Sequence, residues 1–206
     1  MGLSTSRFVE IQVFNNTKDI TLKKPRTYFY SGHSPNSSLP SVSPGSSSSS
    51  KFTNSSILWG CNGVLAYEAD SFTLAIYFSN PMDHNLFSVE MGLEMSLDKV
   101  HRWDLGTTYH RLLRCSQGSS NGSMFPCVIL KDSQDQAQLS VGPVTVTATV
   151  ARGRSTVIKV EVEERENRDG GTGSESRCRA RNARRCENLQ GLEGDLEAKP
   201  GSARAA

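Results

Sequence analysis

The residues best suited to hold a ligand lie where an apolar run ends in the middle of the chain. Residues 72–78 are rich in β-branched and aromatic side chains, which is typical of a buried strand. Ser79, Asn80 and Pro81 end this run, because proline cannot donate to a strand ladder. A corner of this kind can bind a small polar group or contact a membrane surface. The alternative is an ordinary strand–loop–strand corner with no ligand.

Catalytic patterns are absent from the sequence. The four histidines are scattered, without a helical i, i+4 pair or a zinc spacing: His33, His84, His101 and His110. Asp83 precedes His84, but neighbouring residues in an extended chain point to opposite faces. The nucleophile elbow, the P-loop and the dinucleotide-binding glycine pattern are missing. We therefore expect no enzyme activity, no cofactor and no metal site.

Composition and charge limit the kinds of partner that the protein is expected to bind. The chain has 206 residues and a net charge of +2, so no basic excess points to nucleic acid. No apolar run reaches the length of about 18 residues that a membrane-spanning helix needs. A signal-peptide core is not visible near Met1. Cys115 and Cys127 flank a Gly/Ser-rich turn and either pair in an oxidising compartment or stay as reduced thiols.

Hydrophobic periodicity predicts mostly strands. Residues 8–14, 144–150 and 157–162 alternate apolar and polar side chains, and the last two segments read as a hairpin. Further strands are expected at 27–30, 57–68, 72–78, 87–95 and 125–130. Residues 97–113 suit a short helix or two turns. The predicted fold is all-β, a compact antiparallel β-sandwich flanked by one or two short helices.

Two segments are expected to lie outside the packed sandwich. Residues 33–56 are rich in serine and proline and predict a flexible loop. Residues 164–206 contain few apolar side chains and predict a disordered tail. The sandwich domain would then span residues 1–163.

Three blocks of sequence, in a fixed order, carry a resemblance to a known family. They are residues 27–32 (TYFYSG) followed by Leu39 and Pro40, residues 63–67 (GVLAY), and residues 73–88 (TLAIYFSNPMDHNLFS). These blocks resemble the actinoporins, the sphingomyelin-binding pore-forming cytolysins first known from sea anemones, and their actinoporin-like relatives. The resemblance implies a β-sandwich with a phosphocholine site on one rim and an amphipathic N-terminal helix that enters the bilayer.

The resemblance also implies site residues. The phosphocholine-binding residues would be Ser31, Ser79, Pro81, Phe87 and Tyr109. The membrane-contacting residues would be Met82, His84 and Leu86. Hydroxyl groups donate hydrogen bonds to a phosphate, and aromatic faces attract a quaternary ammonium.

Several positions depart from the family pattern. Asn62 stands where the family has a valine, and Met82, His84 and Glu90 stand where it has aromatic residues. Leu113 replaces one of the helical tyrosines. The segment 1–7 is too short to form a helix that spans about 30 Å of hydrocarbon. The sequence therefore supports the fold of the family better than its activity.

Two functions remain open at this stage. The first is a membrane-binding protein that recognises phosphocholine or sphingomyelin and forms cation-permeable pores as a homo-oligomer. Family members are secreted and then act at a target membrane, whereas the lack of a visible signal peptide suggests a cytoplasmic or membrane-peripheral location. The second is a lectin-like or protein-binding sandwich that has lost pore formation.

Overall fold

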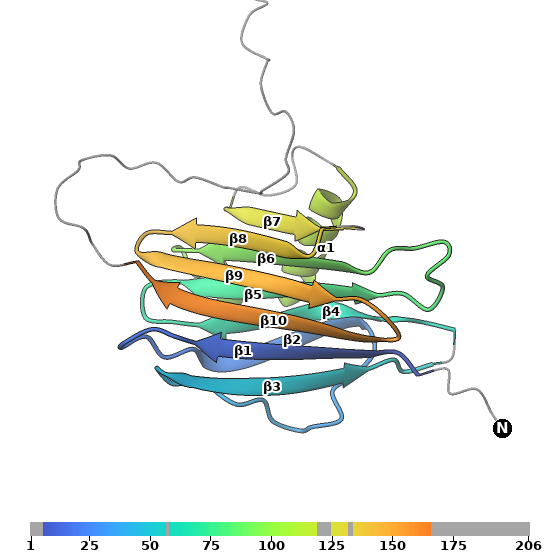
Figure 1. The fold of residues 1–206 in the computed structure, drawn as a ribbon, viewed down its shortest axis with the longest axis horizontal. Coiled ribbons are helices and arrows are strands. Elements are labelled where there is room, and N and C mark those ends of the chain that lie inside the picture. Colours follow the sequence, from blue (N-terminus) through green and yellow to red (C-terminus); the bar gives the residue numbers. More distant parts are fainter. Residues whose placement is uncertain (1–5, 57, 119–124, 132–133, 166–206) are drawn as a thin grey trace, which may run out of the picture.

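The described part of the protein is a two-sheet sandwich with one α-helix on its outside (Figure 1). The computed structural model describes residues 6–56, 58–118, 125–131 and 134–165. The elements within them are β1 (Phe8–Asn15), β2 (Lys23–Ser31), β3 (Ser46–Thr53), β4 (Cys61–Glu68), β5 (Thr73–Asn80), β6 (Glu90–Ser96), the 3-10 helix η1 (Val100–Arg102), α1 (Leu105–Ser116), β7 (Cys127–Leu130), β8 (Gln136–Val141), β9 (Val144–Ala151) and β10 (Ser155–Glu164). The predicted all-β sandwich with a short helix is confirmed.

The two sheets contain five strands each. One has the order β3-β1-β10-β9-β8 and the other has the order β2-β4-β5-β6-β7. Figure 1 shows the first sheet in front of the second, with the axes of the strands in both sheets nearly aligned. The prediction was an antiparallel sandwich. The structure differs at one pair of strands, since β1 and β10 pair in parallel, with Ile11 opposite Ile158. The predicted terminal hairpin is present, since β9 and β10 pair antiparallel.

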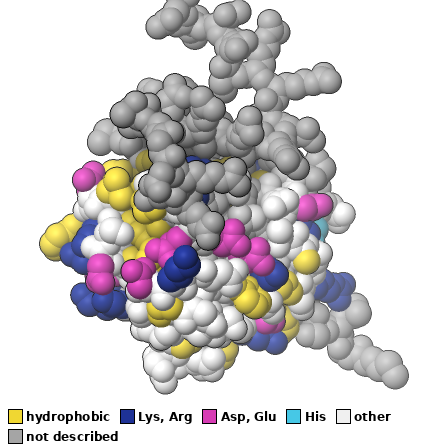
Figure 2. Space-filling model, turned by 60° about the vertical axis from the view of Figure 1, so that its left-hand side comes forward, with side chains coloured by type: hydrophobic (Ala, Val, Ile, Leu, Met, Phe, Trp, Pro, Cys, Tyr) yellow, Lys and Arg dark blue, Asp and Glu magenta, His cyan; other side chains and the backbone are white. Residues whose placement is uncertain are grey.

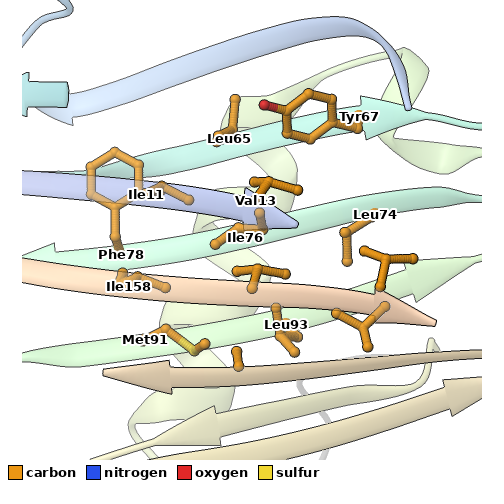
Figure 3. Packing of buried hydrophobic residues seen from close by; sticks show 14 of the residues in the cluster. Ile11, Val13, Leu65, Tyr67, Leu74, Ile76, Phe78, Met91, Leu93 and Ile158 are labelled. Carbon is orange, nitrogen blue, oxygen red and sulfur yellow. The ribbon is translucent and has the colours of Figure 1, made fainter. Parts of the chain in front are cut away.

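The main core fills the space between the sheets. Along β1, the residues Val9, Ile11 and Val13 are fully buried, as the alternating pattern predicts. Figure 3 shows Ile11 and Val13 facing buried side chains from the second sheet, such as Leu65 and Ile76. Burying one such side chain contributes about 1.5–3 kcal/mol. This core fixes the register of both sheets and so fixes where each strand ends.

Helix α1 covers part of the outer face of the second sheet. Its N-cap is Asp104, whose carboxylate accepts a hydrogen bond from the Gly106 amide at 2.8 Å. Leu105, Tyr109 and Leu112 on one side of the helix are buried against the sheet, where they form a second cluster with Val64, Ala66, Ala75 and Tyr77. The helix leaves the ends of these strands uncovered.

A buried ionic network attaches the helices to this sheet. Glu94 on β6 is fully buried, and its carboxylate receives the Arg111 guanidinium of α1 through Nε at 2.9 Å and through Nη2. The same carboxylate lies 2.8 Å from Nε2 of His101 in η1. On its other side, Nδ1 of His101 lies 2.8 Å from the Thr73 hydroxyl. Glutamate, histidine and hydroxyl are arranged as in a catalytic triad, but all three are buried, so we assign them a structural role.

The serine-rich segment differs from its prediction. Residues 33–56 were expected to form a flexible loop, but Ser46–Thr53 form the edge strand β3, which pairs with β1 along its whole length. Val42 also bridges to Leu22 and is fully buried. At an edge strand with only one neighbour, backbone pairing and the single buried ring of Phe52 suffice, so a strong apolar pattern is not needed. The predicted tail lies outside the described residues, except Glu164, which belongs to β10, and Arg165.

Candidate functional site

Four polar side chains form a line across the end of the second sheet. Ser31 on β2 pairs with Asn62 on β4, Asn62 pairs with Ser79 on β5, and Ser79 pairs with Glu90 on β6. Residues directly opposite each other on neighbouring strands point to the same face, about 5 Å apart. We call these four residues the polar row. Two of them, Ser31 and Ser79, are predicted site residues, and the structure brings them together.

The polar row lies on the outer face of the sheet, beyond helix α1. Val64 lies two residues after Asn62, and Tyr77 two residues before Ser79, so they share the face of the row. Val64 and Tyr77 are buried beneath α1, whereas all four residues of the row are partly exposed. The row is therefore open to a ligand where the helix no longer covers the sheet.

Hydrogen bonds orient the groups of the row. The Ser79 hydroxyl donates to Oδ1 of Asn62 at 2.9 Å, and the Ser31 hydroxyl donates to the Gly60 carbonyl at 2.7 Å. The Glu90 carboxylate accepts from the Tyr77 hydroxyl at 3.3 Å and lies 3.8 Å from Nζ of Lys131. The row thus presents hydroxyl and amide groups, with a carboxylate and an ammonium at one end.

A pocket adjoins the other end of the row. It has a volume of about 400 Å³ and is lined by Tyr30, Ser31, Gly32, Ser55, Ser56 and Trp59. The aromatic side chains in this lining are well exposed, at 55% for Tyr30 and 59% for Trp59. The pocket therefore combines ring faces with hydroxyl groups, and Ser31 belongs to both the pocket and the row.

Tyr109 lies beneath this surface. Its side chain is buried, and its ring stacks on that of Tyr30 with centroids 5.4 Å apart and planes 8° apart. The rings of Tyr28 and Tyr77 lie 5.6 Å from it on other sides. Burial is the main cause that raises the pKa of Tyr109, so the phenol stays neutral. A ligand at the surface meets Tyr30, and the predicted contact with Tyr109 is not open in this structure.

The loop between β5 and β6 carries the other predicted residues. It is the green loop at the right of Figure 1. Leu86 is 73% exposed and Phe87 is 63% exposed, whereas Pro81 is buried. The Asp83 side chain accepts from the Asn85 amide at 2.8 Å, and its carbonyl accepts from the Phe87 amide at 3.1 Å. These bonds form a turn that presents the two apolar side chains to solvent.

Met82 and His84, in the same loop, form hydrogen bonds with residues at the ends of strands. The Met82 carbonyl accepts a hydrogen bond from the Arg7 guanidinium, and Nε2 of His84 lies 2.9 Å from the Asn80 side-chain oxygen. Partial burial, followed by the nearby positive charge of Arg7, lowers the pKa of His84. The imidazole is therefore neutral at neutral pH, and its hydrogen bond with Asn80 holds this exposed side chain against the end of β5.

Gly60 joins the pocket to this loop. A Cβ atom at Gly60 would lie 2.3 Å from the Asn80 carbonyl oxygen and 2.7 Å from Cα of Pro81. Only glycine allows the backbone before β4 to approach the end of β5 this closely. Trp59 is thereby held next to the corner at Pro81.

Exposed apolar side chains gather at this end of the sandwich. Among the described residues, seven large apolar side chains are exposed, and five of them lie in segments that meet here: Tyr30, Leu58, Trp59, Leu86 and Phe87. We call these five residues the apolar rim. The other two, Leu97 and Trp103, follow the opposite ends of the strands. Figure 2 brings forward the left side of Figure 1, which is the end away from the apolar rim. Acidic and basic side chains lie side by side there.

Sequence reasoning missed Trp59 and the role of Tyr30. Residues 57–68 were interpreted as one strand, but β4 begins at Cys61, and Trp59 belongs to the loop before it. Gly60 was the available signal, since a glycine within a predicted strand marks a bend or a close backbone approach. Tyr30 was counted as a strand residue, and only the packing on Tyr109 shows its outer position.

One solved structure of another protein supports the fold. The lipid-binding protein Nakanori has a similar structure, with a TM-score of 0.55, 14% sequence identity, and coverage of 76% of this chain and 70% of that protein. A lectin from Xerocomus chrysenteron is matched at a TM-score of 0.47 and 8% identity, over 76% of this chain and 97% of the lectin. No family model and no curated protein matches the chain. Within the described part of the chain, no helix is long and apolar enough to cross a membrane.

Proposed function

We propose that this protein binds lipid membranes with the apolar rim and holds a zwitterionic phospholipid headgroup on the polar row and in the adjoining pocket. The observation that carries the proposal is that, of the seven large apolar side chains exposed among the described residues, five cluster beside a line of hydroxyl, amide and carboxylate groups. Apolar patches rimmed by polar groups mark interaction surfaces in soluble proteins.

The apolar rim has the composition that a membrane interface favours. Tryptophan and tyrosine have an apolar body and a polar tip, so they settle at the level of the headgroups. Leu86 and Phe87 project from a loop whose backbone is fixed by its own hydrogen bonds. Burying one such side chain contributes about 1.5–3 kcal/mol, so two or three together provide useful affinity even after the cost of association.

The headgroup would be held by hydroxyl groups and ring faces. The pocket serines Ser55 and Ser56 supply hydroxyl donors for a phosphate, next to Ser31, whose own proton is directed at the Gly60 carbonyl. The exposed rings of Tyr30 and Trp59 supply faces that attract an ammonium group. The expected ligand from the resemblance, the phosphocholine group of sphingomyelin, has both features. The fold similarity to a lipid-binding protein is consistent with this class of ligand.

Pore formation is the further part of the proposal. In the actinoporins, membrane-bound copies assemble into cation-permeable pores, and the three sequence blocks at residues 27–32, 63–67 and 73–88 carry the same expectation to this chain. Assembly would make further copies of the chain its protein partners. This step rests on the resemblance, whereas membrane attachment rests on the rim.

A second candidate function has one observation in its favour. A pocket with two exposed aromatic rings and several serine hydroxyls also suits a sugar ring, which stacks its C–H face on aromatic side chains. A lectin-like protein would bind soluble glycans without vesicles, and a membrane-binding protein would not.

The experiment that tests the proposal combines vesicle sedimentation with dye leakage. The full chain is mixed with phosphatidylcholine vesicles, with and without sphingomyelin, and with a panel of soluble glycans. Sedimentation with leakage supports both parts of the proposal, and sedimentation without leakage supports lipid binding and removes pore formation. Binding to glycans but to no vesicle would replace the proposal with the lectin-like function.

A further inference from the structure

Glu90 gives one end of the polar row a negative charge. It lies opposite Ser79 at the first position of β6, directly after the loop that carries Leu86 and Phe87. Its side chain is 19% exposed, so it is accessible at the site without being free in solvent. A carboxylate at this point attracts the cationic part of a headgroup.

The partners of Glu90 leave part of its hydrogen-bonding capacity open. Oε2 accepts from the Tyr77 hydroxyl at 3.3 Å, and Oε1 lies 3.8 Å from Nζ of Lys131, which is too far for a close hydrogen bond. A carboxylate has about four lone-pair directions, so further donors can approach it. Burial and the charge of Glu90 raise the pKa of Tyr77, and the phenol therefore keeps the proton that it donates.

The ring faces near Glu90 are covered. Tyr77 is 1% exposed because helix α1 packs over it, and Tyr109, which belongs to α1, is 3% exposed because it packs between the sheet and the ring of Tyr30. A quaternary ammonium has no N–H group and depends on accessible aromatic faces. A primary ammonium instead donates three hydrogen bonds and needs acceptors. This end of the row offers acceptors, namely the Glu90 carboxylate and the oxygens of Ser79 and Asn62.

We propose that the polar row selects headgroups with a primary ammonium, of the phosphoethanolamine class, over phosphocholine. The ammonium donates to Glu90 and to the oxygens of Ser79 and Asn62, and the phosphate lies toward Nζ of Lys131. This selectivity rests on the proposed function, since it concerns the lipid that the same rim would meet. Glu90 is the residue that determines it, because it is the only carboxylate of the row.

The test uses vesicles of phosphatidylcholine in which an increasing fraction is replaced by phosphatidylethanolamine of the same acyl chains. The full chain should sediment with half-maximal binding at a lipid concentration about tenfold lower at high ethanolamine content, the size of one charge-assisted hydrogen bond. The variant Glu90→Gln should lose this preference and bind both vesicle types alike. Glu161→Gln, which removes the same charge on β10 in the other sheet, should retain the preference.

Soluble headgroups provide a second readout without a membrane. Calorimetric titration of O-phosphoethanolamine should show tighter binding than titration of phosphocholine, and Glu90→Gln should remove the difference. Equal or tighter binding of choline headgroups, or a preference that persists in Glu90→Gln, would overturn the selectivity while leaving lipid binding intact. Sedimentation with neither type of vesicle would overturn lipid binding and the selectivity together.

Discussion

Ser79 and Glu90 face each other across β5 and β6, and the loop that joins their strands carries the exposed side chains of Leu86 and Phe87. The polar row and the apolar rim are therefore adjacent by chain connectivity as well as by packing. A ligand with a polar head and an apolar body would contact both at once. This adjacency is the basis of the membrane-binding account.

Trp59 should report membrane contact by fluorescence. The chain has two tryptophans, so Trp103→Phe leaves Trp59 as the single tryptophan. Because Trp59 belongs to the apolar rim, its emission should shift to the blue when vesicles are added. The matched variant Trp59→Phe keeps only Trp103, at the opposite end, and its emission should not change. A shift in the second variant but not in the first would place the membrane-contacting surface at the opposite end of the sandwich, near Trp103, and would contradict the proposal.

The buried network of Glu94 should make a large contribution to the free energy of unfolding, because it attaches η1 and α1 to the second sheet. Arg111→Met removes the guanidinium and its two hydrogen bonds from the buried carboxylate of Glu94. Breaking a buried ion pair in this way costs about 3–5 kcal/mol of unfolding free energy. Arg114→Met, on the exposed side of the same helix, should cost less than about 0.5 kcal/mol. Denaturant unfolding measures both, and similar losses in the two variants would contradict a stabilising role for the network.

Cys115 and Cys127 should form a disulfide when an oxidant is supplied. Their sulfur atoms lie 3.9 Å apart, at the end of α1 and the start of β7, and both side chains are partly exposed. With oxidised glutathione, the two thiols lose two protons and two electrons to form the S–S bond, and the glutathione disulfide is reduced. Cys61 is buried, and burial raises its pKa to about 12, so it should stay reduced and unreactive.

Peptide mapping of a Cys178→Ser/Cys186→Ser variant checks this pairing without interference from the other two cysteines. The expected product is one disulfide between residues 115 and 127 and one free thiol at residue 61. Continued alkylation of Cys115 and Cys127 in the folded protein after oxidation would show that the two thiols do not come together.

His84 should make the protein slightly less stable at mildly acidic pH. Partial burial and Arg7 lower its pKa in the folded protein, whereas the unfolded chain takes up the proton at the ordinary histidine value. The unfolded state therefore binds more protons as the pH falls below that value, and the unfolding free energy decreases. His84→Gln should reduce this decrease, as measured by denaturant unfolding between neutral pH and about pH 5. An identical pH profile in the variant would show that the imidazole makes no net contribution.

The sequence predicted the parts of the fold that bury apolar side chains at a regular spacing. The strands β1, β9 and β10 alternate strictly and were found in their predicted places, because one face of each packs on the core. Strand β3 was missed because four consecutive serines precede its first buried residues, Ser50 and Phe52. The parallel pairing of β1 with β10 could not be predicted, since local periodicity does not specify the direction of a partner.

The candidate site was predicted in part. Ser31 and Ser79 lie together in the polar row, as the resemblance implies, and Leu86 and Phe87 are exposed beside them. Trp59 was not predicted because its position depends on how Gly60 packs against Pro81, a contact between segments distant in sequence. Tyr109 was expected to contact phosphocholine, but whether the ring of a helical tyrosine is covered depends on its neighbours, here Tyr30.

Vesicle sedimentation of two paired variants tests the central claim most directly. Leu86→Ser/Phe87→Ser removes two exposed side chains of the apolar rim, and Leu97→Ser/Trp103→Ser removes two at the opposite end. All four side chains are exposed, so both variants should fold like the parent protein. The account predicts that the rim variant binds vesicles at least about tenfold more weakly, while the control variant binds like the parent. Equal binding by the two variants, or loss of binding in the control alone, would contradict it.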